Sequence, residues 1–240
     1  MAEEIRKSFH RDLDEVCADV VRMAAMSTEA MTRATDALLE ADMALAQDII
    51  DHDDDIDVLS ASIEERCFRL LALQAPLAAD LRAVAATMRI NSDVERSADL
   101  AVNIAKGARR IYGHQIPVRV RGIIGQMSEE AVRITRLAID AYVDRNGALG
   151  AALDDIDNRL DQLQADFVEA MFEAHDDNAL ALQPAVQLAL IARYYERIGD
   201  HAVNIGERVA FMASGHQKEH PGVARIRERE LAEESSNRNP

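Results

Sequence analysis

The sequence predicts an all-α fold, a tandem repeat of two three-helix bundles made of six long helices. The chain of 240 residues is 48% apolar and 4% aromatic, with no Trp, ten Gly and five Pro, and such a composition favours long helices over a fold with many turns. Apolar residues recur at spacings of three and four through most of the chain, and no strand pattern appears. A long motif also occurs twice at a fixed offset, which indicates a duplicated unit.

The first half of the chain contains three predicted helices. Apolar spacing predicts the first over about 9–39 and the second over about 43–72. The third is expected to have Pro76 in its first turn and to run to Ile111, where Gly113 ends it.

After a short linker the same order of helices returns. The spacing predicts helices over about 118–146 and 148–175, and a last helix that ends at about Met212. Asp176, Asp177 and Asn178 are expected to supply the turn and the N-cap before that last helix. The predicted organisation is a first repeat over 1–113, a second over 114–215, and a mobile C-terminal tail over 216–240.

The duplication is clearest in the third helix of each unit. Residues 95–105 read ERSADLAVNIA and residues 196–206 read ERIGDHAVNIG, an offset of 101 (95 to 196) with seven of eleven positions identical. The second helices also correspond, because residues 54–57 and 154–157 both read DDID. The chain is therefore interpreted as two copies of a three-helix unit.

The net charge limits the partners of the protein. It carries 27 Lys and Arg against 43 Asp and Glu, a net charge of −16. The negative electrostatic potential of such a chain repels nucleic acids and anionic lipids. We expect no nucleic-acid binding, and membrane association only through protein partners. No apolar run approaches the length of a membrane span and the N-terminal segment is charged, which predicts a cytoplasmic protein.

Both copies of the motif place carboxylates and an amide on one helical face, because residues four apart share a face. These are Glu95, Asp99 and Asn103 in the first copy, and Glu196, Asp200 and Asn204 in the second. The acids are the expected ligands, and the two asparagines are expected to lie behind them and support them. Stacked acids repel each other, so keeping them in both repeats indicates a compensating cation. Antiparallel second helices would add Asp53, Asp57 and Asp157. Oxygen-only ligands suit Mg²⁺, Ca²⁺, Mn²⁺ or iron, which predicts one cation site in each repeat.

Other interpretations of these acids stay open. They would be ordinary solvated charges if they paired with nearby arginines, the candidates being Arg82, Arg89, Arg96, Arg193 and Arg197. No histidine follows a glutamate by three residues, which removes the main support for a di-iron oxidase. His201 is expected at the surface or behind the ligands, since its counterpart is Leu100. No phosphate loop or catalytic nucleophile is recognisable, so no catalytic residue is predicted.

The two motif copies resemble the E-R-x-G-D-x-A-x-N-I signature that occurs twice in the PhoU family of phosphate-transport regulators. Residues 74–90, QAPLAADLRAVAATMRI, are similar to the segment before the first signature, and the resemblance covers about 9–215. Two positions depart from the pattern. Ala98 replaces the usual Gly, and Leu153 stands where a carboxylate matching Asp53 is expected, so the second site is expected to have fewer ligands.

The resemblance implies a cytoplasmic, non-enzymatic protein that couples the Pst phosphate transporter, through its ATPase subunit, to the PhoR sensor kinase. It implies negative regulation when phosphate is plentiful, a homodimer, and metal ligands at Glu95, Asp99, Glu196 and Asp200, with the second-helix acids as further candidates. The competing hypotheses are a carboxylate-bridged di-metal enzyme and a structural scaffold that needs no metal.

Overall fold

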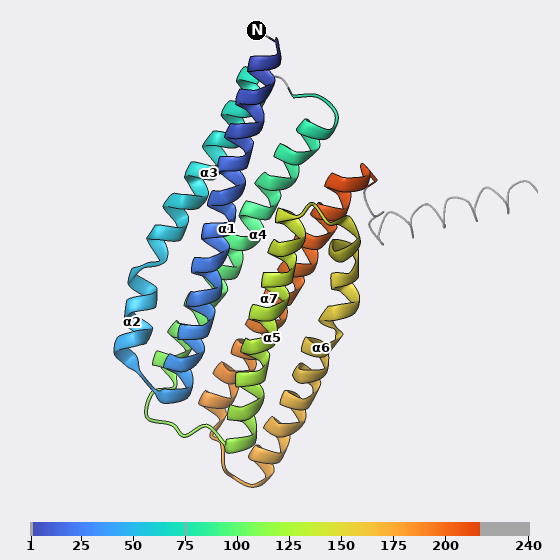
Figure 1. Ribbon diagram of the computed structural model, residues 1–240. Coiled ribbons are helices and arrows are strands. Elements are labelled where there is room, and N and C mark those ends of the chain that lie inside the picture. The colour runs from blue at the N-terminus through green and yellow to red at the C-terminus, as the bar shows by residue number, and fades with distance from the viewer. Residues whose placement is uncertain (1, 75, 217–240) are drawn as a thin grey trace, which may run out of the picture.

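The computed structural model describes residues 2–74 and 76–216, and all regular structure in them is helical (Figure 1). The helices are α1 (Ala2–Glu40), α2 (Met43–Asp51), α3 (Asp53–Gln74), α4 (Ala79–Arg110), α5 (Val118–Val143), α6 (Gly147–Asp176) and α7 (Leu182–Ser214). The predicted mobile tail, except for His216, lies outside the described residues. None of the described helices is long and apolar enough to cross a membrane.

The prediction of a single second helix in the first repeat is wrong, because it is broken at His52 into α2 and α3. Asp42 caps α2 by accepting hydrogen bonds from the backbone N–H groups of Ala44 and Leu45, both at 3.0 Å. His52 ends α2, and its backbone N–H donates to the Asp48 carbonyl at 3.1 Å. A new helix begins at once with three aspartates, which are favourable at the positive end of a helix dipole.

Two other predicted helix starts are corrected. Pro76 lies outside α4, which begins at Ala79 because Ala78 adopts a left-handed φ of 47° that interrupts the helix. The predicted N-cap for the last helix is also wrong: α6 runs on through Asp176, and Ala181 precedes α7 without a side-chain cap. Asn178, with a φ of 55°, makes the turn between them.

The seven helices form two bundles that pack side by side (Figure 1). Helices α1 to α4 make the first bundle and α5 to α7 the second, with α4 against α7 and α1 against α5. Both buried apolar clusters draw residues from both repeats. One contains Met31, Ile104, Ile124 and Leu188, and the other contains Val20, Ile63, Ile134 and Val209. The two repeats therefore share their apolar cores.

Helices α4 and α7 are antiparallel, and their contacts fix the register of the two repeats. Ser97 Oγ is hydrogen-bonded to His201 Nδ1 at 3.1 Å, and Gly107 packs against Ile191. This register places Asp99 level with Gly199 and beside the level of Asp200. The two copies of the motif therefore cross at the middle of the molecule.

A buried hydroxyl network joins the two repeats. The Tyr195 hydroxyl of α7 lies 2.7 Å from Thr35 Oγ1 of α1, and Thr35 donates to Ser128 Oγ of α5 at 2.7 Å. Buried polar groups are costly without partners, so this network specifies how the three helices pack together.

Candidate metal centre

The first acidic cluster lies where α3 begins beside the middle of α4. Asp53 and Asp57 are one turn apart on α3, and Asp99 faces them from α4. Each contributes a carboxylate oxygen to a group in which all three oxygens lie within 4.8 Å of one another. The break at His52 contributes to this arrangement, because it starts α3 at Asp53.

Burial and mutual repulsion raise the pKa values of acids in this cluster. The pKa values of Asp53, Glu95 and Asp99 are all raised, first by partial burial and next by neighbouring carboxylates, with Lys106 lowering those of Asp53 and Asp99. Among the described residues, no ion pair includes a carboxylate of this cluster, whose members are Asp53, Asp57, Glu95 and Asp99. Arg96 lies 3.8 Å from Asp93 instead. The ion-pair interpretation is therefore not supported for the first cluster.

The second cluster lies between α6 and α7 and holds Asp157, Glu196 and Asp200. Partial burial, followed by repulsion from Asp161 and Asp200, raises the pKa of Asp157 to about 6. The pKa of Asp200 is raised by burial and then by Glu196. Within the described part of the chain, these carboxylates do not converge as tightly as the first three do. Glu196 also forms an ion pair with Arg193 on its own helix.

Asp161 is a member of this cluster that sequence reasoning missed. Leu153, at the position that matches Asp53, is fully buried in the core. Leu153 lies one turn before Asp157 on α6, and Asp161 lies one turn after it. The carboxylate of Asp161 raises the pKa values of both Asp157 and Asp200. The second cluster therefore still has four carboxylates, and the spacing of four from Asp157 was the signal that could have identified the fourth.

Gly199 allows Asp157 to approach α7 closely. A Cβ at this position would lie 2.5 Å from Asp157 Oδ1 and 2.7 Å from Leu160 Cδ2. The equivalent residue in the first repeat is Ala98, which is buried. The small residue of the motif thus affects the position of an acid as well as helix packing.

Three carboxylate oxygens in the two clusters are buried without a hydrogen-bond partner. They are Asp53 Oδ1, Asp157 Oδ1 and Glu196 Oε2. A buried unpaired acceptor is unfavourable, and a cation between the carboxylates would satisfy it. The donor set is oxygen only, so these residues fit a hard cation such as Mg²⁺ or Mn²⁺, or iron.

The two asparagines of the motif are partly exposed, one turn beyond Asp99 and Asp200. Within residues 2–74 and 76–216, neither Asn103 nor Asn204 hydrogen-bonds a carboxylate. Their predicted supporting role therefore stays a prediction.

His201 does not lie at the surface, which was one of the two positions expected from the sequence. Its side chain is buried between α4 and α7 and hydrogen-bonded to Ser97, and burial lowers its pKa to about 4. It is a neutral packing residue at neutral pH, behind the acidic face of α7.

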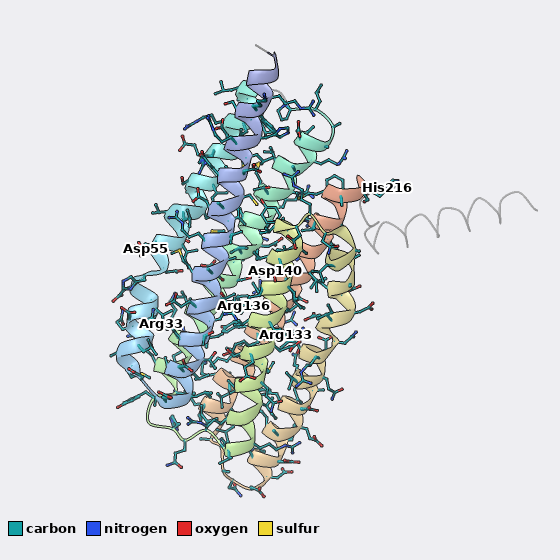
Figure 2. All side chains as sticks on the ribbon, viewed as in Figure 1. Arg33, Asp55, Arg133, Arg136, Asp140 and His216 are labelled. Carbon is teal, nitrogen blue, oxygen red and sulfur yellow. The ribbon has the colours of Figure 1, made fainter. Side chains whose placement is uncertain are left out.

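Of the surface grooves beside α1, two bear on the location of the acidic clusters. One of about 250 Å³ reaches the first cluster, where Asp53 lines it together with Glu29 and His52. The other, of about 560 Å³, lies between α1 and α5, with Arg33, Arg136 and Asp140 in its lining (Figure 2). It contains none of the predicted ligands, so it is separate from the acidic clusters.

Comparisons with known proteins agree with this architecture. The family model described as the PhoU domain matches twice, over residues 20–108 and 124–209. The chain is 35% identical, over 88% of its length and 99% of the relative, to a phosphate-specific transport system accessory protein PhoU homolog 2 of Mycobacterium tuberculosis. It is 34% identical to a PhoU homolog of the same description from Zymomonas mobilis, over 88% of this chain and 89% of that protein.

Solved structures show the same fold. The crystal structure of PhoU from Pseudomonas aeruginosa superposes with a TM-score of 0.80 and 26% identity, covering 87% of this chain and all of that one. The phosphate transport system regulatory protein PhoU from Streptococcus pneumoniae gives a TM-score of 0.81 and 25% identity, with 88% and 100% covered.

Proposed function

The chain belongs to the PhoU family, and we propose from this premise that it regulates phosphate uptake and phosphate-starvation signalling. In this proposal it couples the Pst phosphate transporter to the PhoR sensor kinase and acts as a negative regulator when phosphate is plentiful. The observation that carries the proposal is the match of both repeats to the PhoU domain, together with relatives named as phosphate-transport accessory proteins over nearly their full length.

We propose that the protein acts by binding partners and not by turnover. Its relatives are named as accessory and regulatory proteins, and neither acidic cluster includes a histidine of the Glu-x-x-His type. Its proposed partners are the transporter ATPase subunit and the sensor kinase, with a homodimer as its own assembly. A net charge of −16 disfavours direct contact with anionic lipid, so the proposed cytoplasmic protein reaches the membrane through these partners.

The two acidic clusters are the proposed cation sites. Asp53, Asp57 and Asp99, with Glu95 beside them, would hold one ion or more between α3 and α4. Asp157, Asp161, Glu196 and Asp200 would do the same between α6 and α7. A bound cation would neutralise the carboxylates and link each helix pair. Three unpaired buried oxygens support this assignment.

The cation proposal is tested by melting curves with a chelator and with added Mg²⁺, Mn²⁺ or iron. At a hundredfold excess over its dissociation constant, a cation stabilises the fold by about 2.7 kcal/mol. The double variant Asp99→Ala and Asp200→Ala should lose this response. The proposal would be contradicted if elemental analysis found no metal in the protein and no added cation changed the melting temperature. If the metal-loaded protein hydrolysed a phosphate ester, the result would favour the enzyme hypothesis.

Deletion of the gene tests the regulatory role. The phosphate-starvation response should stay on in phosphate-rich medium, and the wild-type chain should restore repression. A variant without Glu95, Asp99, Glu196 and Asp200 should restore it only partly. Normal repression in the deletion strain, also after removal of any second copy, would refute the proposed role.

A further inference from the structure

The exposed large apolar side chains of this protein gather at two equivalent places, one in each repeat. Of the thirteen in the described residues, nine lie where the second helix of a repeat ends and the third begins. Patch A consists of Phe68, Leu73, Leu77 and Leu81, which are 45% to 80% exposed. Patch B consists of Val168, Phe172, Leu182, Val186 and Leu190, which are 42% to 76% exposed.

Patch B is continuous across α6 and α7. These helices are antiparallel, with Gly150 against Gly206 and Asp157 against Gly199. The same register places Phe172 between the levels of Leu182 and Val186. On α7, the three apolar residues of the patch follow one another at spacings of four, so they share one helical face.

The acidic clusters lie on the same helical faces as the patches. On α6, Asp157 and Asp161 precede Val168 and Phe172 at spacings of four, seven and four, which keep one face of a helix. In the first repeat Asp57 and Phe68 are related by the same combined spacing of eleven. Each patch therefore continues a stripe that begins at an acidic cluster in the middle of the molecule.

The two patches lie at opposite ends of the molecule (Figure 1). Leu81 is near the start of α4, and Leu182 is the first residue of the antiparallel α7. At a rise of 1.5 Å per residue, the register of these two helices separates them by about 50 Å along the axis. The molecule is thus a bar with an apolar patch at each end and carboxylates between.

Each patch is large enough to form the apolar part of one protein interface. Leu, Phe and Val side chains that are 42% to 80% exposed offer on the order of 100 Å² each, so each patch provides about 400–500 Å². A stable protein interface buries about 800 Å² on each partner, and a little over half of that area, about 450 Å², is apolar. The duplicated chain therefore presents two interface-sized apolar patches, which suits a partner that presents its own surface twice.

We propose that the two patches dock a two-fold symmetric protein, one patch on each of its protomers. This inference rests on the proposed function, since it assumes a regulator that works by binding proteins. A symmetric partner presents the same surface twice, as this duplicated chain does. The partner surface is apolar and bordered by Lys and Arg, because it passes over the carboxylates. A second copy of this chain fits worse, since it would bring two chains of net charge −16 together at their acidic faces.

The test measures binding of the purified ATPase subunit of the phosphate transporter. One variant changes patch A (Leu73→Glu with Leu77→Glu), and another changes patch B (Phe172→Glu with Leu182→Glu). A matched control, Val118→Glu with Val143→Glu, adds the same charge at exposed apolar sites outside both patches. Circular dichroism checks that all variants fold, which the exposure of these positions favours.

The expected result is a complex that contains two ATPase protomers for each copy of this chain. Each patch variant should weaken binding by about 100-fold or more, because losing one of two linked contacts removes the avidity, and the control should stay within about twofold. Equal binding of all variants, dependence on one patch only, or no binding by the wild-type chain would overturn the proposal.

Two further measurements address the other possible occupants. Light scattering would reveal a second copy as the occupant if the patch variants changed the mass of the free protein. Anionic phosphatidylglycerol vesicles would reveal a membrane as the occupant if they bound the wild type but not the patch variants. Either result overturns the inference. If the wild-type chain restores phosphate control in the deletion strain and the patch variants do so equally well, the docking inference fails while the proposed function stands.

Discussion

Replacing Asp157 by Asn should stabilise the metal-free protein at neutral pH. Asp157 is partly buried beside Asp161 and Asp200, and its pKa is raised from 3.8 to about 6. In a fully buried site this change would correspond to about 3 kcal/mol. Because the side chain is only half-buried, solvent screening reduces the expected gain to about 1 kcal/mol.

The sign of the pH dependence follows from the raised pKa. Between pH 4 and pH 6 the folded chain binds a proton at Asp157 that the unfolded chain has released, so the stability from this group falls as the pH rises through that window. Asn does not titrate. The difference between the variant and the wild type should therefore be close to zero at pH 4 and reach its full value by pH 7.

Urea unfolding at pH 4 and pH 7, with a chelator present, measures this difference. Asp155→Asn is the matched control, because Asp155 is an exposed acid on the same helix. Added Mn²⁺ should reverse the order at pH 7, since the variant has lost a ligand. A variant that is less stable than wild type without metal at pH 7, or a gain that is equal at both pH values, would refute this account of the cluster.

Four more substitutions test the packing of the helices. Gly206→Ala should destabilise the fold by about 2 kcal/mol in urea, because the new Cβ would meet the carbonyl oxygen of the facing glycine on α6; Gly122→Ala, with open space around it, should instead stabilise by about 0.5–1 kcal/mol. Tyr195→Phe should cost about 1–2 kcal/mol in the same assay by removing the hydroxyl that bonds Thr35, and an unchanged stability would contradict the role of that network. Because the pKa of His201 is lowered from 6.5 to about 4, the wild-type protein should lose stability as the pH falls through this range, by about 2 kcal/mol between pH 7 and pH 5. Leu does not titrate, so His201→Leu should lack this loss. An unchanged pH profile of stability would contradict this account.

The sequence alone was sufficient for the helical class and for the two-repeat fold. The residues that face the core recur at helical spacing along the chain, so the helices can be recognised from the sequence. A motif that recurs at a constant offset identifies equivalent helices even when their contacts are unknown. Spacing of four also grouped Glu95 with Asp99 and Glu196 with Asp200. These are properties of single helices, and the chain order already contains them.

Tertiary structure decided how these helices meet. Local backbone geometry broke the second helix at His52 and moved the start of α4 past Ala78, and apolar periodicity does not report on either. Asp161 joins the second cluster, and His201 is buried, because of the neighbouring helices that they face. Spacing along one helix shows which residues share a face, but the partner of that face and its distance depend on packing between helices. For that reason the acids were predictable as ridges on single helices, and their grouping into two clusters was decided by the tertiary fold.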